Sequence, residues 1–227
     1  MKIRNIIFSG LLLGAMFLSS CDKTKDNSKE ESSSHTKPIS YKVNESQYNE
    51  LAKQDHYYEN ILSTNFTVNH EVKNDDSTTE LITKIDNGKV YFYIPGYGDN
   101  YIEFKEGTYN VENNTWTADI YYEEDGNMIK ETIQDYSGED VLLLPNIGYI
   151  VSYDEVKYNS KNHCYEMIAE SKVLNQYYTY TDVKVKFQDD KLIYQTYTVT
   201  DTKGNVSVST WNYSDFGTTK VELPIIE

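Results

Sequence analysis

Four patterns of apolar and polar residues follow one another along this chain. A mostly apolar run from Ile6 to Leu18 comes first, and residues 22–40 are then almost entirely polar. Apolar residues recur at helical spacing over 45–62, and from about residue 63 they mostly alternate with polar ones, which is typical of half-buried strands. The pattern therefore predicts a leader, a disordered tether, one helix and a long series of strands.

The helical spacing predicts a single helix over residues 45–62, which is the first ordered element that we expect. The apolar residues near one face of this helix are Tyr48, Leu51, Ala52, Tyr58, Ile61 and Leu62. Asp55 and His56 interrupt that face, and either Asn44 or Ser46 has a suitable side chain to cap the start of the helix.

Alternation over the rest of the chain predicts about eight to ten antiparallel strands, each beside its neighbour in sequence. The clearest turn is Asn87-Gly88, because a type I′ turn needs positive φ at both of its central residues. No strand–helix–strand rhythm is present, so a parallel sheet is not expected. The predicted fold class is mainly β, an antiparallel meander with few helices.

One apolar stretch, residues 141–150, breaks the alternation. Pro145 lies inside it and would break a long helix, and Gly148 follows three residues later. We interpret this stretch as a short helix and a loop that cross over the sheet. Two hypotheses for its role remain open: a plug that fills the core, or a mobile lid on an apolar cavity.

The start of the chain is typical of an exported protein. Lys2 and Arg4 precede the apolar run, which is too short to span about 30 Å of hydrocarbon comfortably. The run ends at Leu18-Ser19-Ser20-Cys21, which resembles the lipobox of bacterial lipoprotein precursors. That resemblance implies that Cys21 receives a diacylglyceryl group and becomes the N-terminus. The alternative is an ordinary signal peptide with an incidental cysteine.

These features predict three parts: a signal peptide over residues 1–20, a disordered tether over 21–40, and a single folded domain over 41–227. The lipid on Cys21 would hold the chain at the cell membrane, on its extracytoplasmic side. Acyl chains bury their methylenes at about 0.8 kcal/mol each, so two or three of them form a stable anchor.

The net charge and the number of cysteines limit which binding partners and which disulfides are expected. The net charge is −15, and it becomes −17 once the signal peptide, which has two basic and no acidic residues, is removed. Such an acidic chain repels phosphate backbones, so nucleic acid is not an expected partner. If Cys21 is acylated, Cys164 has no partner for an intramolecular disulfide. Cys164 follows His163 and could be a nucleophile beside a base, but a small apolar residue in a strand is the favoured interpretation.

Catalytic and metal-binding motifs are missing from the sequence. It has no Gly-x-Ser-x-Gly elbow, no His-Glu-x-x-His, no phosphate-binding glycine loop and no Cys-x-x-Cys. The four histidines, at positions 35, 56, 70 and 163, are scattered, and acidic pairs such as Asp189-Asp190 lie where turns are expected. We therefore expect no enzyme activity, no cofactor and no metal, although an acid pair brought together by the fold would not be visible in the sequence.

A family resemblance rests on the predicted order of elements, which is one helix followed by a long antiparallel meander with a helical crossing in mid-chain. It also rests on the tail Trp211–Pro224, in which an aromatic-Ser-Asp-aromatic-Gly turn follows a strand. The chain resembles the lipoprotein-localisation factors, a LolA-like half-barrel superfamily that includes mycobacterial LppX-type lipoproteins. The resemblance implies an incomplete β-barrel with helices closing its mouth, and a concave apolar surface that shields acyl chains or another hydrophobic ligand. It brings no catalytic residues.

Apolar residues of the alternating strands and of the 141–150 stretch are candidates to line that surface. They are Val90, Phe92, Ile94, Phe104, Trp116, Ile120, Leu143, Ile147 and Tyr149. The leading hypothesis is a non-catalytic, membrane-anchored and monomeric lipoprotein that binds a small hydrophobic ligand. The alternative is an interaction or adhesion module that binds a protein or glycan through a surface rich in tyrosine, of which the chain has 22.

Overall fold

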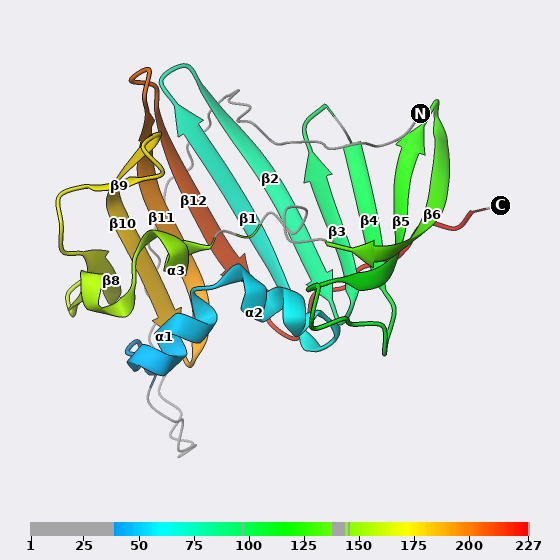
Figure 1. Cartoon of the computed structure of the whole chain (residues 1–227), viewed down its shortest axis with the longest axis horizontal. Coiled ribbons are helices and arrows are strands. Elements are labelled where there is room, and N and C mark those ends of the chain that lie inside the picture. Colours follow the sequence, from blue (N-terminus) through cyan, green and yellow to red (C-terminus); the bar gives the residue numbers. More distant parts are fainter. Residues whose placement is uncertain (1–38, 97, 138–143, 145, 227) are drawn as a thin grey trace, which may run out of the picture.

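A computed structural model describes residues 39–96, 98–137, 144 and 146–226 of the chain. Within these residues, 12 antiparallel strands form one sheet, and the two outermost strands do not pair with each other. The predicted fold class, mainly β with an unclosed barrel, is confirmed. Helices cover one face of the sheet at its lower end in the view of Figure 1, and this covered face is called the inner face below.

The strands fall into two runs that each follow the order of the sequence. The first run comprises β1 (Asn65–Asn74), β2 (Ser77–Asp86), β3 (Lys89–Ile94), β4 (Gly98–Phe104), β5 (Trp116–Glu124) and β6 (Asn127–Tyr136). The second comprises β7 (Val156–Asn159), β8 (Cys164–Met167), β9 (Lys172–Leu174), β10 (Tyr178–Gln188), β11 (Lys191–Asp201) and β12 (Val206–Ser214). Asn87 and Gly88 both have positive φ, as predicted for the turn between β2 and β3.

The sheet order corrects the prediction that every strand lies beside its neighbour in sequence. The order is β6-β5-β4-β3-β2-β1-β12-β11-β10-β8-β7, with β9 pairing on β10. The first and last strands, β1 and β12, pair over eight residues at the centre of the sheet. As a result β6 and β7, which are consecutive in sequence, lie at opposite edges of the sheet. Residues 137–155, which connect them, are called the crossing segment below.

The predicted single helix is divided into α1 (Glu45–Leu51), α2 (Gln54–Glu59) and the 3₁₀ turn η1 (Ile61–Ser63). Asn44 caps α1 as expected, in a reciprocal capping box with Gln47. On one continuous helix, Tyr48 and Tyr58 would point about 80° apart, since each residue turns the helix by about 100°. The break lets both rings face the sheet, where both are fully buried.

The crossing segment contains the short helix α3 (Ile147–Ile150) and the 3₁₀ turn η2 (Tyr153–Glu155). Gly148 donates its backbone N–H to the carbonyl oxygen of Ala52 at 2.9 Å, so α3 is joined to the end of α1. A Cβ at Gly148 would lie 3.2 Å from Cγ of Lys53 and 3.4 Å from that carbonyl oxygen, so glycine permits the close approach. The predicted short helix is therefore present, whereas residues 141–143 and 145 of the predicted crossing lie outside the described residues.

The core lies between these helical segments and the lower half of the inner face. Leu144, Ile147 and Ile150 of the crossing segment are all buried in it. The phenol of Tyr58 donates to the carbonyl oxygen of Tyr136 at 2.7 Å and so connects α2 to the edge strand β6. The described part of the crossing segment therefore fills the core as a plug. Separately, no described helix has the length and apolar content needed to span a membrane.

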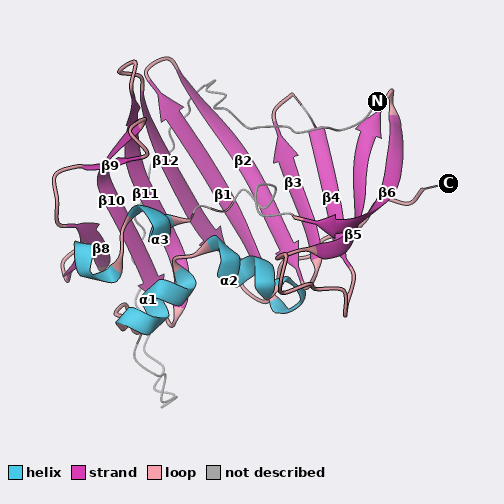
Figure 2. Cartoon of the chain, in the orientation of Figure 1, coloured by secondary structure: helices cyan, strands magenta, loops and turns pink. Residues whose placement is uncertain are grey.

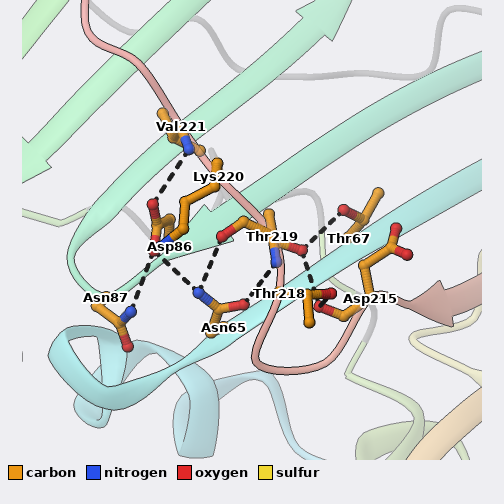
Figure 3. Close-up of polar contacts among 9 residues, drawn as sticks. All are labelled: Asn65, Thr67, Asp86, Asn87, Asp215, Thr218, Thr219, Lys220 and Val221. Carbon is orange, nitrogen blue, oxygen red and sulfur yellow. Dashed lines mark hydrogen bonds and ion pairs between the residues drawn. The ribbon is translucent and has the colours of Figure 1, made fainter.

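The C-terminal tail is fastened across the outer face by a polar cluster at the lower ends of β1 and β2 (Figure 3). Gly217 and Thr219 donate their N–H groups to the backbone oxygen and the side-chain oxygen of Asn65, both at 3.0 Å. Asp86 accepts from the Nδ2 group of Asn65 at 2.9 Å and from the N–H of Val221 at 3.2 Å. The predicted turn is present, whereas residues 220–226 form no strand.

Replacing Asp86 by alanine is expected to lower the free energy of unfolding by about 1–3 kcal/mol, because donors from Asn65 and Val221 lose their acceptor. Urea denaturation followed by circular dichroism measures the change. Lys220→Ala is the matched control: its amino group lies 3.7 Å from Asp86 and its side chain is 77% exposed, so it should change stability by less than about 0.5 kcal/mol. Equal effects of the two substitutions would contradict the role of Asp86 as the acceptor that holds the C-terminal tail on the sheet.

Candidate functional site

The predicted ligand-lining residues lie mostly in the lower, helix-covered part of the inner face. Val90, Phe92, Phe104, Trp116 and Ile147 are buried. Ile94 and Ile120 are half-buried, and Tyr149 points outward from α3 and is 65% exposed. Leu143 lies outside the described residues.

Described side chains already contact the buried candidates. The ring of Phe104 lies 5.8 Å from that of Tyr58 and 5.9 Å from that of Trp116, measured between centroids. Tyr109 stacks on the other side of Trp116 at 4.8 Å. These residues therefore belong to the core beneath α2, and ligand contact with any of them stays a prediction.

The inner face continues above the helices. In Figure 2 the upper halves of β1, β2, β11 and β12 extend beyond α1 and α2. The upper inner face is defined by six half-buried residues from four strands: Val72, Thr79, Leu81, Tyr180, Tyr197 and Val199. Five of the six are apolar or aromatic, so this surface is suited to a hydrophobic ligand.

A row of three residues on adjacent strands is called the floor: His70, Trp211 and Gln195. This row begins beside Leu81, the register partner of His70, and lies below the other residues of the upper inner face. The rings of His70 and Trp211 stack with centroids 4.0 Å apart and planes within 11°. Tyr197 contacts the indole at 5.2 Å, and Tyr180 lies 5.2 Å from Tyr197. An aromatic path thus leads from the floor to the upper inner face.

Several polar atoms here are buried and have no hydrogen-bond partner. They are both ring nitrogens of His70, the hydroxyl oxygen of Thr79 and the Oε1 atom of Gln195. Gln195 uses its other amide atom, Nε2, to donate to the phenol oxygen of Tyr213 at 2.5 Å. Burial lowers the pKa of His70 to about 4, so its imidazole is neutral at pH 7. An unpaired buried polar group costs about 1–3 kcal/mol, which makes this group of atoms an unusual feature of the interior.

Two surface hollows formed by described residues lie elsewhere. One, of about 470 Å³, lies along β7 and β8 between Lys157 and Ile168. The other, of about 310 Å³, lies at the lower mouth of the barrel, where Tyr57, Phe66 and Phe216 meet Lys191. Both are open to solvent, and neither includes a floor residue.

Candidate catalytic groups do not converge in the described part of the chain. Cys164 is buried in β8 and donates its thiol to Glu166 at 3.3 Å, and burial together with that carboxylate raises the pKa of the thiol to about 11. A thiol with so high a pKa is a poor nucleophile at neutral pH. His163 stacks on Tyr41 instead, at 4.3 Å. The described residues include no group of three or more metal-ligating side chains.

Tyrosines of the outer face form a cross-strand ladder. Tyr91 and Tyr101 lie 5.3 Å apart, and Tyr121 is the register partner of Tyr101 on β5. Lys84 lies over the first ring at 5.5 Å and Lys130 over the last at 5.4 Å. These rings contact their neighbours within the sheet, so the ladder stabilises the sheet. Tyr121 is buried, whereas Tyr91 and Tyr101 are half-buried.

None of the three floor residues is among the residues that the sequence predicts to line a ligand site. His70 was noticeable only as a polar residue in phase with Phe66, Val68 and Val72, and Trp211 only as part of the tail. Gln195 lies within a long predicted strand and gives no signal without the register. A polar residue at an inward position of an alternating strand is the signal that would have identified His70.

Comparison with known proteins adds two structural likenesses. A LolA superfamily protein from Nitrosomonas europaea is 12% identical, with 74% of this chain and 94% of that chain covered at a TM-score of 0.26. A DUF1329 family protein from Desulfovibrio piger is 10% identical, with 79% and 94% covered at a TM-score of 0.27. No family model and no curated protein matches the chain. The superfamily that the sequence resembles is thus among the structural matches.

Proposed function

We propose that this chain is a membrane-anchored lipoprotein whose half-open barrel binds a hydrophobic, lipid-like ligand on its inner face without catalysing a reaction. The observation that carries the proposal is an unclosed sheet whose inner face, above the helices that cover its lower half, combines half-buried apolar and aromatic residues of β1, β2, β10 and β11 with small polar residues. Val72, Leu81 and Val199 are only half-buried there, so they present apolar surface that the described core does not take up.

The anchor rests on the sequence of the leader and on where the tether meets the domain. In the β10–β11 turn the N–H of Asp189 donates to the carbonyl oxygen of Ser40 at 2.8 Å, and the N–H of Ser40 donates to the carboxylate of Asp189 at 3.1 Å. This turn lies at the lower end of the sheet, near α1. If residues 21–40 tether the chain to the membrane, the lower end of the sheet therefore lies nearer to the membrane than the upper inner face does.

Cys21→Ser is expected to abolish lipid modification, because the acyl groups are attached through the cysteine thiol. Metabolic labelling with an alkyne-bearing fatty acid in a bacterial host measures the modification after gel separation. Cys164→Ser is the matched control and should label as strongly as the unchanged chain, since Cys164 is buried in β8 and is not part of the lipobox-like segment Leu18–Cys21. Label that persists in Cys21→Ser would refute the anchor.

Ligand binding is tested on the mature chain, residues 21–227, carrying Cys21→Ser so that no covalent lipid is present. Organic extraction followed by mass spectrometry should recover a co-purifying apolar molecule at close to one per chain. Leu81→Glu should remove it by placing a charge on the inner face. Ile82→Glu is the matched control, because the next residue on the strand points to the opposite face. A chain that stays empty when offered lipid vesicles would defeat the proposal.

A further inference from the structure

Three polar side chains on the inner face have buried atoms that lack partners, and they come from three strands of the same surface. This polar trio consists of His70 on β1, Thr79 on β2 and Gln195 on β11. His70 and Gln195 flank Trp211 in register, and Thr79 pairs with Val72, the next inward residue above His70. The trio therefore marks one region, where the floor meets the upper inner face.

The hydrogen-bonding capacity of the trio defines the chemistry of a complementary group. A neutral imidazole offers one N–H donor and one acceptor, and a threonine hydroxyl can act as either. The free Oε1 atom of Gln195 can only accept, since Nε2 is engaged with Tyr213. A partner for all three must both donate and accept hydrogen bonds. A hydroxyl group does this, whereas an ester or ether oxygen only accepts.

Charge excludes the commoner lipid head groups from this region. The inward residues of β1, β2, β11 and β12 around the polar trio are uncharged: Val72, Asn74, Ser77, Thr79, Leu81, Tyr197, Val199, Ser207 and Ser209. Two charged residues on this face are already paired: Asp201, at the upper end of β11, accepts from Asn205 at 2.7 Å, and Lys172, the register partner of Tyr180, pairs with Glu155 at 2.7 Å. A carboxylate or phosphate placed here would lose its hydration without gaining a counter-charge, which is strongly unfavourable. The surface thus favours an uncharged head group.

We propose that the polar trio binds the hydroxyl-bearing head of an uncharged amphiphile, of the monoacylglycerol type, whose chain lies on the apolar residues of the upper inner face. The inference rests on the proposed function and specifies its ligand class. The hydroxyls supply donors to Gln195 and exchange hydrogen bonds with His70 and Thr79. The chain covers Val72, Leu81 and Val199.

Three ligands with the same chain and different heads test this: monoolein, methyl oleate and oleate. Each displaces a fluorescent fatty probe from the mature Cys21→Ser chain, below its aggregation concentration. Monoolein should bind about tenfold or more tightly than methyl oleate, because the ester leaves the trio partly unpaired. Oleate should bind most weakly at pH 8. Equal binding of monoolein and methyl oleate, or preference for oleate, would overturn the inference and leave the proposed function standing. Failure of all three to bind would overturn both.

Two variants test whether the polar trio causes the preference for monoolein over methyl oleate. His70→Phe keeps an aromatic ring on Trp211 and removes both nitrogens, and Thr79→Val is nearly isosteric and removes one hydroxyl. Each should weaken the binding of monoolein severalfold and that of methyl oleate less, so that the preference for monoolein shrinks, with a near-ultraviolet circular dichroism spectrum like that of the parent chain. If both variants keep the full preference for monoolein, the head group binds elsewhere and the inference is wrong.

Discussion

Replacing Ile147 by alanine is expected to lower the free energy of unfolding by about 2–5 kcal/mol. The side chain is fully buried among core residues, so truncation loses its transfer free energy and leaves a cavity. Urea denaturation at pH 7, followed by circular dichroism, gives the change from the midpoint and the slope.

Tyr149→Ala on the same short helix is the control. Its side chain is 65% exposed, so its loss should change the free energy of unfolding by less than about 0.5 kcal/mol. A mobile lid would give a different result: Ile147→Ala would leave stability nearly unchanged and alter ligand binding alone. Such an outcome would contradict the assignment of α3 to the core.

The choice between plug and lid shows what local sequence leaves open. Pro145 and Gly148 were sufficient to predict a short helix and a loop in place of a strand. They do not say how deep the segment lies, because depth depends on the hydrogen bond from Gly148 to Ala52, more than ninety residues earlier. A contact between segments so far apart in sequence leaves no periodic signature in either.

The strands were predictable because each one is half-buried, and half-burial imposes alternation on the residues themselves. Their order was only partly predictable. Hairpins such as the one at Asn87-Gly88 carry their own turn signal, whereas the pairing of β1 with β12 joins the two ends of the domain and has none. The same applies to the helix break near Lys53, which follows from the need to bury both Tyr48 and Tyr58 against a curved sheet.

The sequence predicted that the candidate site is a concave apolar surface, but it did not predict which residues form it. Apolar residues with the strongest alternation, such as Val90 and Phe104, are those that the fold uses for its core. The candidate site instead includes polar residues in inward positions, such as the half-buried His70 and the fully buried Gln195. Sequence patterns rank such positions low because a polar side chain weakens the alternation. Functional surfaces are expected where the pattern is imperfect for this reason.

His70 leads to the second large effect, a loss of stability on acidification. Its pKa is about 4 in the folded chain, because burial disfavours the imidazolium, against an ordinary value of 6.5. Between these two pH values the unfolded chain binds a proton that the folded chain does not. The contribution of this group is therefore present in full above pH 6.5 and is lost as the pH falls to about 4. The shift corresponds to about 3 kcal/mol.

The measurement compares the free energy of unfolding at pH 7 and pH 4.5 for the parent chain and for His70→Phe. The variant has no imidazole to protonate, so it should lose about 2–3 kcal/mol less than the parent over this interval. Asp119 and Glu155 also have lowered pKa values, both about 2, but their contributions fall mainly below pH 4.5 and are common to both proteins. Parallel losses in the two proteins would mean that protonated His70 is accommodated in the folded state. The floor would then be accessible to water, and its polar atoms would not require a ligand.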